Sequence, residues 1–253
     1  MGVKITSNII FLGTGGDSYV VGKQLRASGG IILQVGDNQY HIDPGPGSLV
    51  MAKETGINLR ANTALFATHN HLNHCNDINA VIDAMTYGGF DKKGVLVANN
   101  TVINGGDNHA PFLHKYYRDC LEKFIVLEEG RKVGINDVEV MAIKAKHSEP
   151  NAIGYKFITP DYTLAYTGDT IYSVETVSGY EGSNVLILNV PCLRKEENRN
   201  NLCKDDAIEI IKKVNPRLAI ITHFGINFLK ADPLYEVREI QKETSCQVIA
   251  AKD

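Results

Sequence analysis

The chain has 253 residues, enough for one large domain or two small ones, and its 43% hydrophobic and 22% charged content is typical of a globular protein. A net charge of −3 gives no overall attraction to nucleic acid or to anionic membranes. No apolar stretch approaches the roughly 18 residues that span a bilayer, and the apolar run near the N-terminus is too short for an export signal. We therefore expect a cytoplasmic protein without membrane association, whose five scattered cysteines stay reduced.

The first half of the chain alternates short apolar runs with turn residues and amphipathic segments. The apolar runs predict strands at 9–12, 30–35, 39–43, 63–67 and 95–98. Helical patterns predict helices at 48–56, 75–87 and 111–122. The polar, glycine-containing stretch 99–110 predicts a loop. The glycine-rich stretch 13–16 predicts a tight turn rather than a phosphate-binding loop, because no Lys-Ser or Lys-Thr ending follows it.

The second half repeats this order of strands and then helices. Strands are expected at 124–127, 137–145, 152–158, 162–167, 184–190, 217–222 and 247–250, and helices at 204–214 and 233–244. No long linker or internal repeat interrupts the chain, so we expect a single domain over 1–253. Two blocks of strands followed by helices predict two packed sheets with helices outside.

Three histidines lie close together in the sequence THNHLNH over 68–74. Histidines two apart, such as His69 and His71, share a face of an extended chain but not of a helix. The cluster follows an apolar strand and precedes an amphipathic helix, a connection at which α/β proteins commonly build their sites. Because neutral imidazole is the commonest metal ligand, the cluster predicts a metal site. The neighbouring Cys75 is either close to this chemistry or a small core residue.

Four further candidate ligands stand where predicted strands end. They are Asp43, His147, Asp169 and His223. Strands that end at one edge of a sheet can deliver short side chains to one point, so these residues are candidates for the same site.

In combination, these motifs resemble the metallo-β-lactamase-fold hydrolase superfamily, whose signature is HxHxDH followed by a distant His, Asp and His. The match covers nearly the whole chain, through GTGG at 13–16, DPG at 43–45, the histidine cluster, His147, YTGDT at 166–170 and THFG at 222–225. The resemblance implies an α/β fold, a four-layer αβ/βα sandwich. It also implies one metal ion on His69, His71 and His147, and a second on His74 and His223. Asp169 would bridge the two ions, and Asp43 would orient a ligand by a hydrogen bond.

Asn73 departs from the signature, since the family has an aspartate there that binds the second ion. With Asp169, Asn73 is a catalytic candidate, and its amide oxygen can still bind a metal, but it cannot act as a base. The lost negative charge should weaken the second ion and favour anionic substrates. One alternative is that Asn73 caps a helix that begins near His74. Another is a one-metal or inactive member of the superfamily.

The resemblance implies a metal-dependent hydrolase in which a metal-activated hydroxide attacks phosphorus or a carbonyl carbon. We expect two divalent ions, zinc first, with manganese or iron as alternatives. The motifs look most similar to the phosphodiesterase branch that includes ribonuclease Z. Its tRNA-binding arm is missing, because only about 20 residues separate His147 from Asp169, enough for a hairpin. The expected substrate is therefore a phosphodiester or related small anionic ester, either a small molecule or a short nucleotide.

The charged loop at 190–201 offers Arg194, Lys195 and Arg199 as phosphate-binding residues, with solvated surface charges as the alternative reading. Two other functions stay open. One is a mononuclear non-haem iron oxygenase on the same fold, since three ligands plus open positions suit iron. The other is a metal- or ligand-binding member with weakened catalysis. A homodimer is expected from the frequency of symmetric dimers among soluble oligomers.

Overall fold

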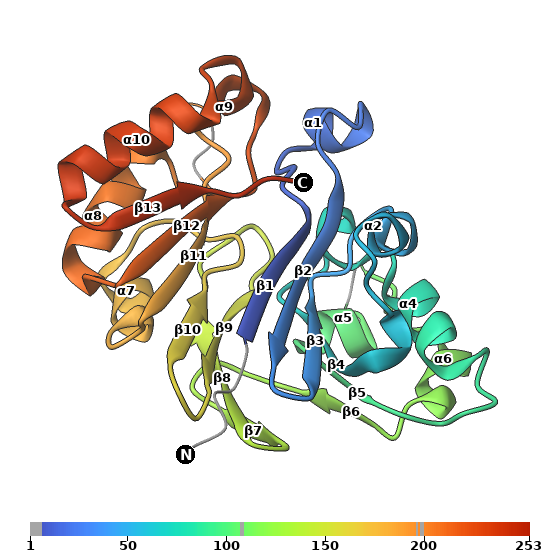
Figure 1. Cartoon of the computed structure of the whole chain (residues 1–253). Helices are drawn as coiled ribbons and strands as arrows, with labels where there is room; N and C mark the ends of the chain where they lie inside the picture. Colours follow the sequence, from blue (N-terminus) through green and yellow to red (C-terminus); the bar gives the residue numbers. More distant parts are fainter. Residues whose placement is uncertain (1–6, 107–108, 196, 198–199) are drawn as a thin grey trace. The chain divides into compact units, whose positions relative to one another are not determined.

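The computed structural model describes residues 7–106, 109–195, 197 and 200–253. The chain divides into two compact units (Figure 1). The N-terminal unit contains the residues up to Gly13, Ala27–Leu127 and Asp253, and the C-terminal unit contains Thr14–Arg26 and Glu128–Lys252. Each unit is a β-sheet with helices, which confirms the predicted α/β class. The single domain over 1–253 stays a prediction.

The N-terminal unit is built on a six-stranded sheet whose strands lie side by side in chain order. They are β1 Ser7–Gly13, β2 Ser28–Val35, β3 Asn38–Ile42, β4 Asn62–Ala67, β5 Val95–Ala98 and β6 Lys123–Val126. The first two pairings are antiparallel and the next three are parallel. Strands β3, β4 and β5 therefore end at the same edge, where they are followed by Asp43, Thr68 and Asn99.

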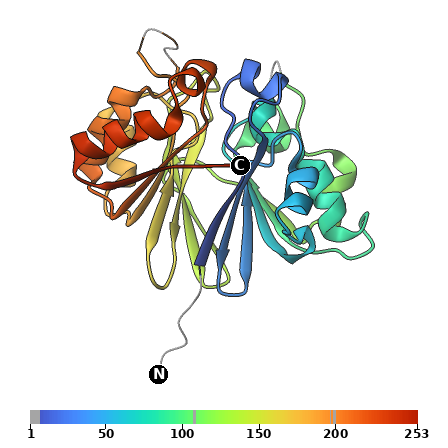
Figure 2. The same ribbon diagram turned by 45° about the horizontal axis from the view of Figure 1, so that its top comes forward.

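Helices of the N-terminal unit pack against this sheet (Figures 1 and 2). They are α2 Ser48–Glu54, the 3₁₀ turn η1 Leu59–Ala61, α3 Leu72–Cys75, α4 Ile78–Thr86, α5 Asn100–Asn104 and α6 Lys115–Cys120. In α4, the buried residues Ile78, Val81 and Met85 join one apolar cluster with Leu65 of β4 and Leu96 of β5. Their spacing of three and four residues places them on one helix face, which is the pattern that the sequence displays.

Some predictions for this unit are wrong. The stretch 99–110 is not a continuous loop, because it contains α5, and the Asn99 side chain accepts a 3.0 Å hydrogen bond from the Val102 N–H at its start. The helix predicted at 75–87 is preceded by a separate turn of helix, α3, and begins only at Ile78. The helix predicted at 111–122 is reduced to the six residues of α6.

The C-terminal unit is built on a seven-stranded sheet in the order β13-β12-β11-β10-β9-β8-β7. Its strands are β7 Lys132–Ile135, β8 Val138–Lys144, β9 Ile153–Ile158, β10 Thr163–Tyr166, β11 Val185–Asn189, β12 Leu218–Thr222 and β13 Gln247–Ala250. Pairings from β7 to β10 are antiparallel, and those from β10 to β13 are parallel. Strands β8, β10, β11 and β12 therefore run in the same direction and end at one edge.

Helices of the C-terminal unit pack against its sheet around a second apolar cluster (Figure 1). They are α7 Val174–Tyr180, α8 Lys204–Val214, α9 Ile226–Lys230 and α10 Pro233–Thr244. The unit also contains α1 Ser18–Gly22. The bounds predicted for α8 and α10 are confirmed, because clear signals mark their ends. In α10 the Asp232 side chain accepts a hydrogen bond from the Leu234 N–H, and Pro233 is the first helical residue. The sequence did not predict the short elements α1, α7, α9 and β7. They have too few residues for a clear apolar pattern.

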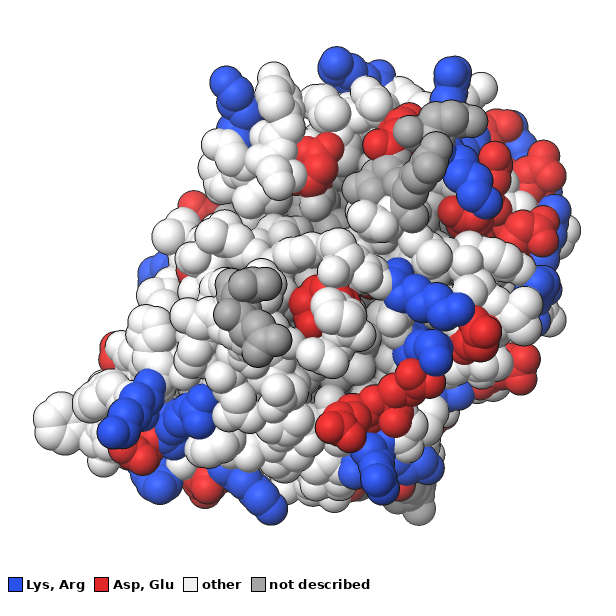
Figure 3. All heavy atoms as spheres, turned by 180° about the vertical axis from the view of Figure 1, so that it is seen from behind, with Lys and Arg blue, Asp and Glu red and all other residues white. Residues whose placement is uncertain are grey.

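None of the helices in the described part of the chain is long and apolar enough to cross a membrane. On the face that Figure 3 shows, lysine and arginine side chains lie beside aspartate and glutamate side chains. Ion pairs among the described residues include Lys132–Glu139 at 2.8 Å and Lys144–Glu129 at 3.3 Å. Interspersed charges of both signs agree with the small net charge of the sequence.

Candidate functional site

Asp43 organises the edge of the N-terminal sheet where β3 and β4 end. Its backbone is left-handed, with φ of +51°, and its N–H donates to the Phe66 carbonyl at 2.8 Å. One carboxylate oxygen accepts the Thr68 N–H at 2.7 Å, and the other accepts the Thr68 hydroxyl at 2.9 Å. The same carboxylate faces Nδ1 of His74 at 2.8 Å, and both side chains are almost fully buried. An ionised carboxylate only accepts hydrogen bonds, so the proton of His74 is on Nδ1 and its lone pair is on Nε2.

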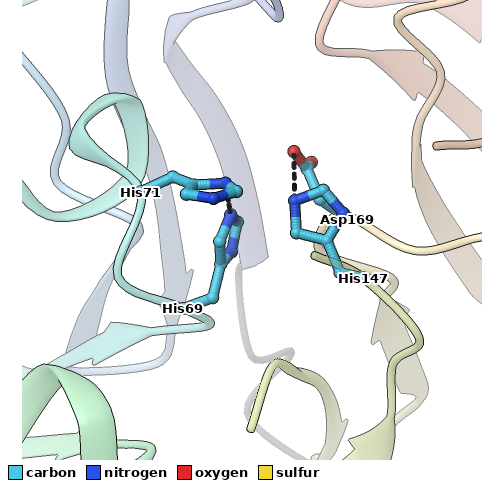
Figure 4. A group of neighbouring side chains, drawn as sticks. All are labelled: His69, His71, His147 and Asp169. Atoms are coloured by element: carbon cyan, nitrogen blue, oxygen red, sulfur yellow. Dashed lines mark hydrogen bonds and ion pairs between the residues drawn. The ribbon is translucent and has the colours of Figure 1, made fainter. Parts of the chain in front are cut away.

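His69 is linked to Asp43 through Thr68. The Thr68 hydroxyl gives its proton to the carboxylate, so it accepts the 2.9 Å hydrogen bond from Nδ1 of His69. The lone pair of His69 is therefore on Nε2, which lies 2.9 Å from Nδ1 of His71 (Figure 4). Two ring nitrogens at this distance can share a proton or direct lone pairs to one cation. In the N-terminal unit, Asp43 thus holds two of the three histidines of the cluster, His74 directly and His69 through Thr68.

Asn73 lies inside α3, half-buried, and does not begin a helix. The helix starts at Leu72 with His71 at its N-cap position, so the predicted capping role of Asn73 is wrong. Its role as a metal ligand stays a prediction. Cys75 is fully buried in the apolar cluster, and its thiol donates to the His71 carbonyl at 3.0 Å. Burial raises the pKa of Cys75 far above its ordinary value, which keeps the thiol protonated and supports the core alternative.

The C-terminal unit gathers the other predicted ligands at the edge where β8, β10 and β12 end. His147 follows β8, and its Nδ1 donates to the Asn200 carbonyl at 2.8 Å, which leaves the lone pair on Nε2. That nitrogen lies 3.9 Å from one carboxylate oxygen of Asp169 (Figure 4). The other oxygen of Asp169 lies 3.2 Å from Nε2 of His223, which follows β12. All three side chains are at least nine-tenths buried.

The glycine-rich stretch 13–16 packs against the segment that carries His223. The Gly16 N–H donates to the Phe224 carbonyl at 3.0 Å, and the Phe224 N–H donates to the Thr14 carbonyl at 2.7 Å. A Cβ atom on Gly16 would lie only 1.9 Å from the His223 carbonyl oxygen. The tight turn predicted at 13–16 is wrong, because Gly13 is the last residue of β1 and Gly15 pairs with Phe224 in an isolated parallel bridge. Glycine is needed at position 16 because its backbone approaches that of His223, whose own φ is +66°.

The proposed phosphate-binding residues lie on the surface. Arg194 is exposed, and the Glu197 carboxylate accepts its backbone N–H at 3.1 Å. The Lys195 ammonium lies 3.7 Å from Asp206, and 78% of its side chain is exposed. Arg199 lies outside the described residues. Phosphate binding by these residues stays a prediction.

The structure adds polar residues that sequence reasoning missed. Asn189 ends β11 and donates to Asp169 at 2.8 Å. Asn99 follows β5 and donates to the Thr68 carbonyl at 3.3 Å. Both are buried at the end of an apolar parallel strand, as Asp43 and His223 are. A polar residue directly after an apolar strand therefore predicts a site residue for asparagine as well as for aspartate and histidine.

The chain matches the family model described as the beta-lactamase superfamily domain over residues 38–224. It is 32% identical over 246 residues to the uncharacterized protein MJ1374 of Methanocaldococcus jannaschii, covering 96% of this chain and 92% of that protein. The predicted resemblance to this superfamily is thereby confirmed.

Several solved structures are similar over almost the whole chain. The metallo-beta-lactamase fold protein YhfI from Bacillus subtilis has a TM-score of 0.78 at 16% identity, covering 98% of this chain and 97% of that chain. A diphosphatase from the PhnP family has a TM-score of 0.71 at 18% identity, covering 98% of this chain and 96% of that chain. The short form of human tRNase Z has a TM-score of 0.68 at 13% identity, covering 98% of this chain and 97% of that chain. The chain therefore belongs to the beta-lactamase superfamily domain family and has the metallo-β-lactamase fold.

Proposed function

We propose that this protein is a metal-dependent hydrolase that uses two divalent ions. His69, His71 and His147 would bind one divalent ion, His74 and His223 a second, and Asp169 both. In the N-terminal unit Nε2 of His69 lies 2.9 Å from Nδ1 of His71. In the C-terminal unit the Asp169 carboxylate lies 3.9 Å from Nε2 of His147 and 3.2 Å from Nε2 of His223. Imidazole nitrogens and a carboxylate are metal ligands that suit zinc, with manganese and iron as alternatives.

The observation that carries this proposal is the way in which the histidines are held. Asp43 contacts His74 directly and His69 through Thr68, and the Asn200 carbonyl holds His147. In each case Nδ1 is the donor, so Nε2 is the nitrogen that can bind a metal ion. Metal-binding histidines typically have such a carboxylate or carbonyl partner, which fixes the ring and its tautomer. The residues present therefore fit the ions that the family implies.

The proposed substrate is a phosphodiester or a related small anionic ester. Divalent ions held by these residues would supply positive charge and lower the pKa of water from about 15.7 toward about 7. A diphosphatase and a tRNase Z are among the structures that resemble this chain, which supports a substrate centred on phosphorus. Arg194 and Lys195 would hold an anionic group of the substrate, while Asn73 would supply a neutral oxygen ligand and no base.

Elemental analysis of protein purified without added metal, together with a bis(p-nitrophenyl) phosphate assay, tests the proposal. We expect zinc in the protein and hydrolysis that stops when a chelator removes it and returns when zinc is added. Turnover that persists in the metal-depleted protein would refute the proposal. Iron with dioxygen uptake on a thiol or persulfide would instead support the oxygenase alternative. Full metal content without hydrolysis across phosphodiester, lactone and thioester substrates would support the non-catalytic alternative.

We also propose that the protein works in the cytoplasm as a homodimer on a small-molecule or short nucleotide substrate. Light scattering coupled to gel filtration measures the mass of the particle directly. A particle of 27.8 kDa, the mass of one chain, would refute the dimer.

A further inference from the structure

Asn189 lies between the two strands that deliver ligands in the C-terminal unit. It is the last residue of β11, which pairs with β10 on one side and β12 on the other. Asp169 follows β10 and His223 follows β12. The Asn189 backbone N–H donates to the Thr167 hydroxyl at 3.1 Å, and only 1% of the residue is exposed. Its side chain is therefore held in the interior, beside the carboxylate.

The orientation of the Asn189 amide follows from its partners. Its Nδ2 donates to one carboxylate oxygen of Asp169 at 2.8 Å and to the Tyr166 hydroxyl at 3.1 Å. An ionised carboxylate cannot donate, so the amide must turn its nitrogen toward Asp169. Its Oδ1 is buried and has no hydrogen-bond partner among the described residues. A buried acceptor without a hydrogen bond lowers the free energy of unfolding. The amide therefore keeps its contact with Asp169 although its oxygen stays without a hydrogen bond.

We propose that Asn189 is a positioning residue that fixes the rotation of the Asp169 carboxylate, so that one oxygen faces His223 and the other faces His147. The oxygen bound by Asn189 is the one 3.2 Å from His223, and the other oxygen lies 3.9 Å from His147. Without this hydrogen bond the carboxylate could rotate away from this orientation, because its torsion is broad. A carboxylate oxygen has two lone pairs, so the oxygen held by Asn189 can still bind a metal ion. The inference rests on the proposed function, in which Asp169 serves both ions.

Asn189→Leu tests this role, since leucine has the same branched arrangement of heavy atoms and no donor. Zinc affinity is measured by chelator competition, and the visible spectrum is recorded on the cobalt-substituted protein. We expect zinc binding roughly 10- to 100-fold weaker than in the wild type, and an altered cobalt spectrum. Tyr166→Phe is the matched control: it removes the other partner of the same amide and keeps the contact with Asp169. Its zinc affinity and cobalt spectrum should stay close to those of the wild type.

A double-mutant cycle separates positioning from a structural role. If Asn189 acts through Asp169, then adding Asn189→Leu to Asp169→Ala causes no further loss of zinc affinity. Asn189→Ala, which is smaller and also lacks the donor, repeats the test if the leucine variant does not fold.

Two outcomes would overturn the inference alone while the wild type still binds zinc and hydrolyses its substrate. One is wild-type affinity and spectrum in a folded donor-less variant. The other is a full additional loss in the Asp169→Ala background. A wild-type protein that binds no metal would overturn the proposed function and, with it, this inference.

Discussion

The carboxylate of Asp43 lies 2.8 Å from Nδ1 of His74, and only 4% and 2% of the two side chains are exposed. Asp43 also accepts both hydrogen bonds from Thr68, which in turn holds His69. One buried carboxylate therefore supports two of the three histidines in the cluster. Because a carboxylate accepts more hydrogen bonds than an amide, this arrangement depends on aspartate at position 43.

Asp43→Asn should weaken zinc binding roughly 10- to 100-fold and lower the free energy of unfolding by about 2 kcal/mol. Asparagine keeps the size of the side chain and tolerates the left-handed backbone, so the change isolates the lost charge and acceptor. Chelator competition and denaturant unfolding measure the two effects. Asp77→Asn is the control, since that carboxylate accepts the N–H groups of Gly47 and Ser48 instead. Equal zinc affinity in both variants would contradict the assigned role of Asp43.

Asn73→Asp should tighten binding of the second ion by at least about tenfold, because it adds a charged oxygen where the family signature has one. Zinc stoichiometry and affinity are compared with the wild type in the same competition assay. Unchanged stoichiometry and hydrolysis rate would count against Asn73 as a ligand.

Gly16→Ala should disturb the backbone of His223, because the new Cβ would lie 1.9 Å from its carbonyl oxygen. We expect a loss of about 1–3 kcal/mol in unfolding free energy together with weaker zinc binding. Gly22→Ala, at the end of α1, is the matched control, because a Cβ there meets no atom within 4 Å. If the two variants behaved alike in both assays, the close approach of Gly16 to His223 would have no functional consequence.

His41 should make the protein less stable in acid. Burial lowers the pKa of His41 from 6.5 to about 4, and the hydrogen bond to the Gly29 carbonyl and the charges of Asp43 and Asp77 only partly offset this. Below pH 6.5 the unfolded chain takes up a proton that the folded chain resists. The free energy of unfolding is therefore highest above pH 6.5, and it falls by about 3 kcal/mol as the pH falls to 4.

His41→Gln isolates this effect, since its amide can still donate to Gly29 and does not titrate. Unfolding free energies measured by denaturant titration between pH 4 and 7 give the slope for each protein. We expect a shallower slope in the variant, because other groups titrate in both chains. Identical slopes would show that His41 does not control the acid sensitivity.

Much of the regular structure could be predicted from the sequence. The strands at 95–98 and 247–250 and the helices α8 and α10 have the predicted bounds, because apolar runs and end signals define them locally. The short elements α5, α7, α9 and β7 were missed. A helix of five residues, such as α5, has too few positions for a clear period, and its packing against the sheet decides whether it forms.

The sequence by itself determined the composition of the candidate site. His69, His71 and His74 are neighbours along the chain, and the resemblance to a superfamily added His147, Asp169 and His223. Only the tertiary structure decided how each unit holds them: the link from Asp43 to two histidines, the contact of Asn189 with Asp169, and the place of Asn73 inside α3. The physical reason is that residue types define which donors are available. Hydrogen-bond partners and tautomers depend instead on side chains brought together from strands that are far apart in sequence.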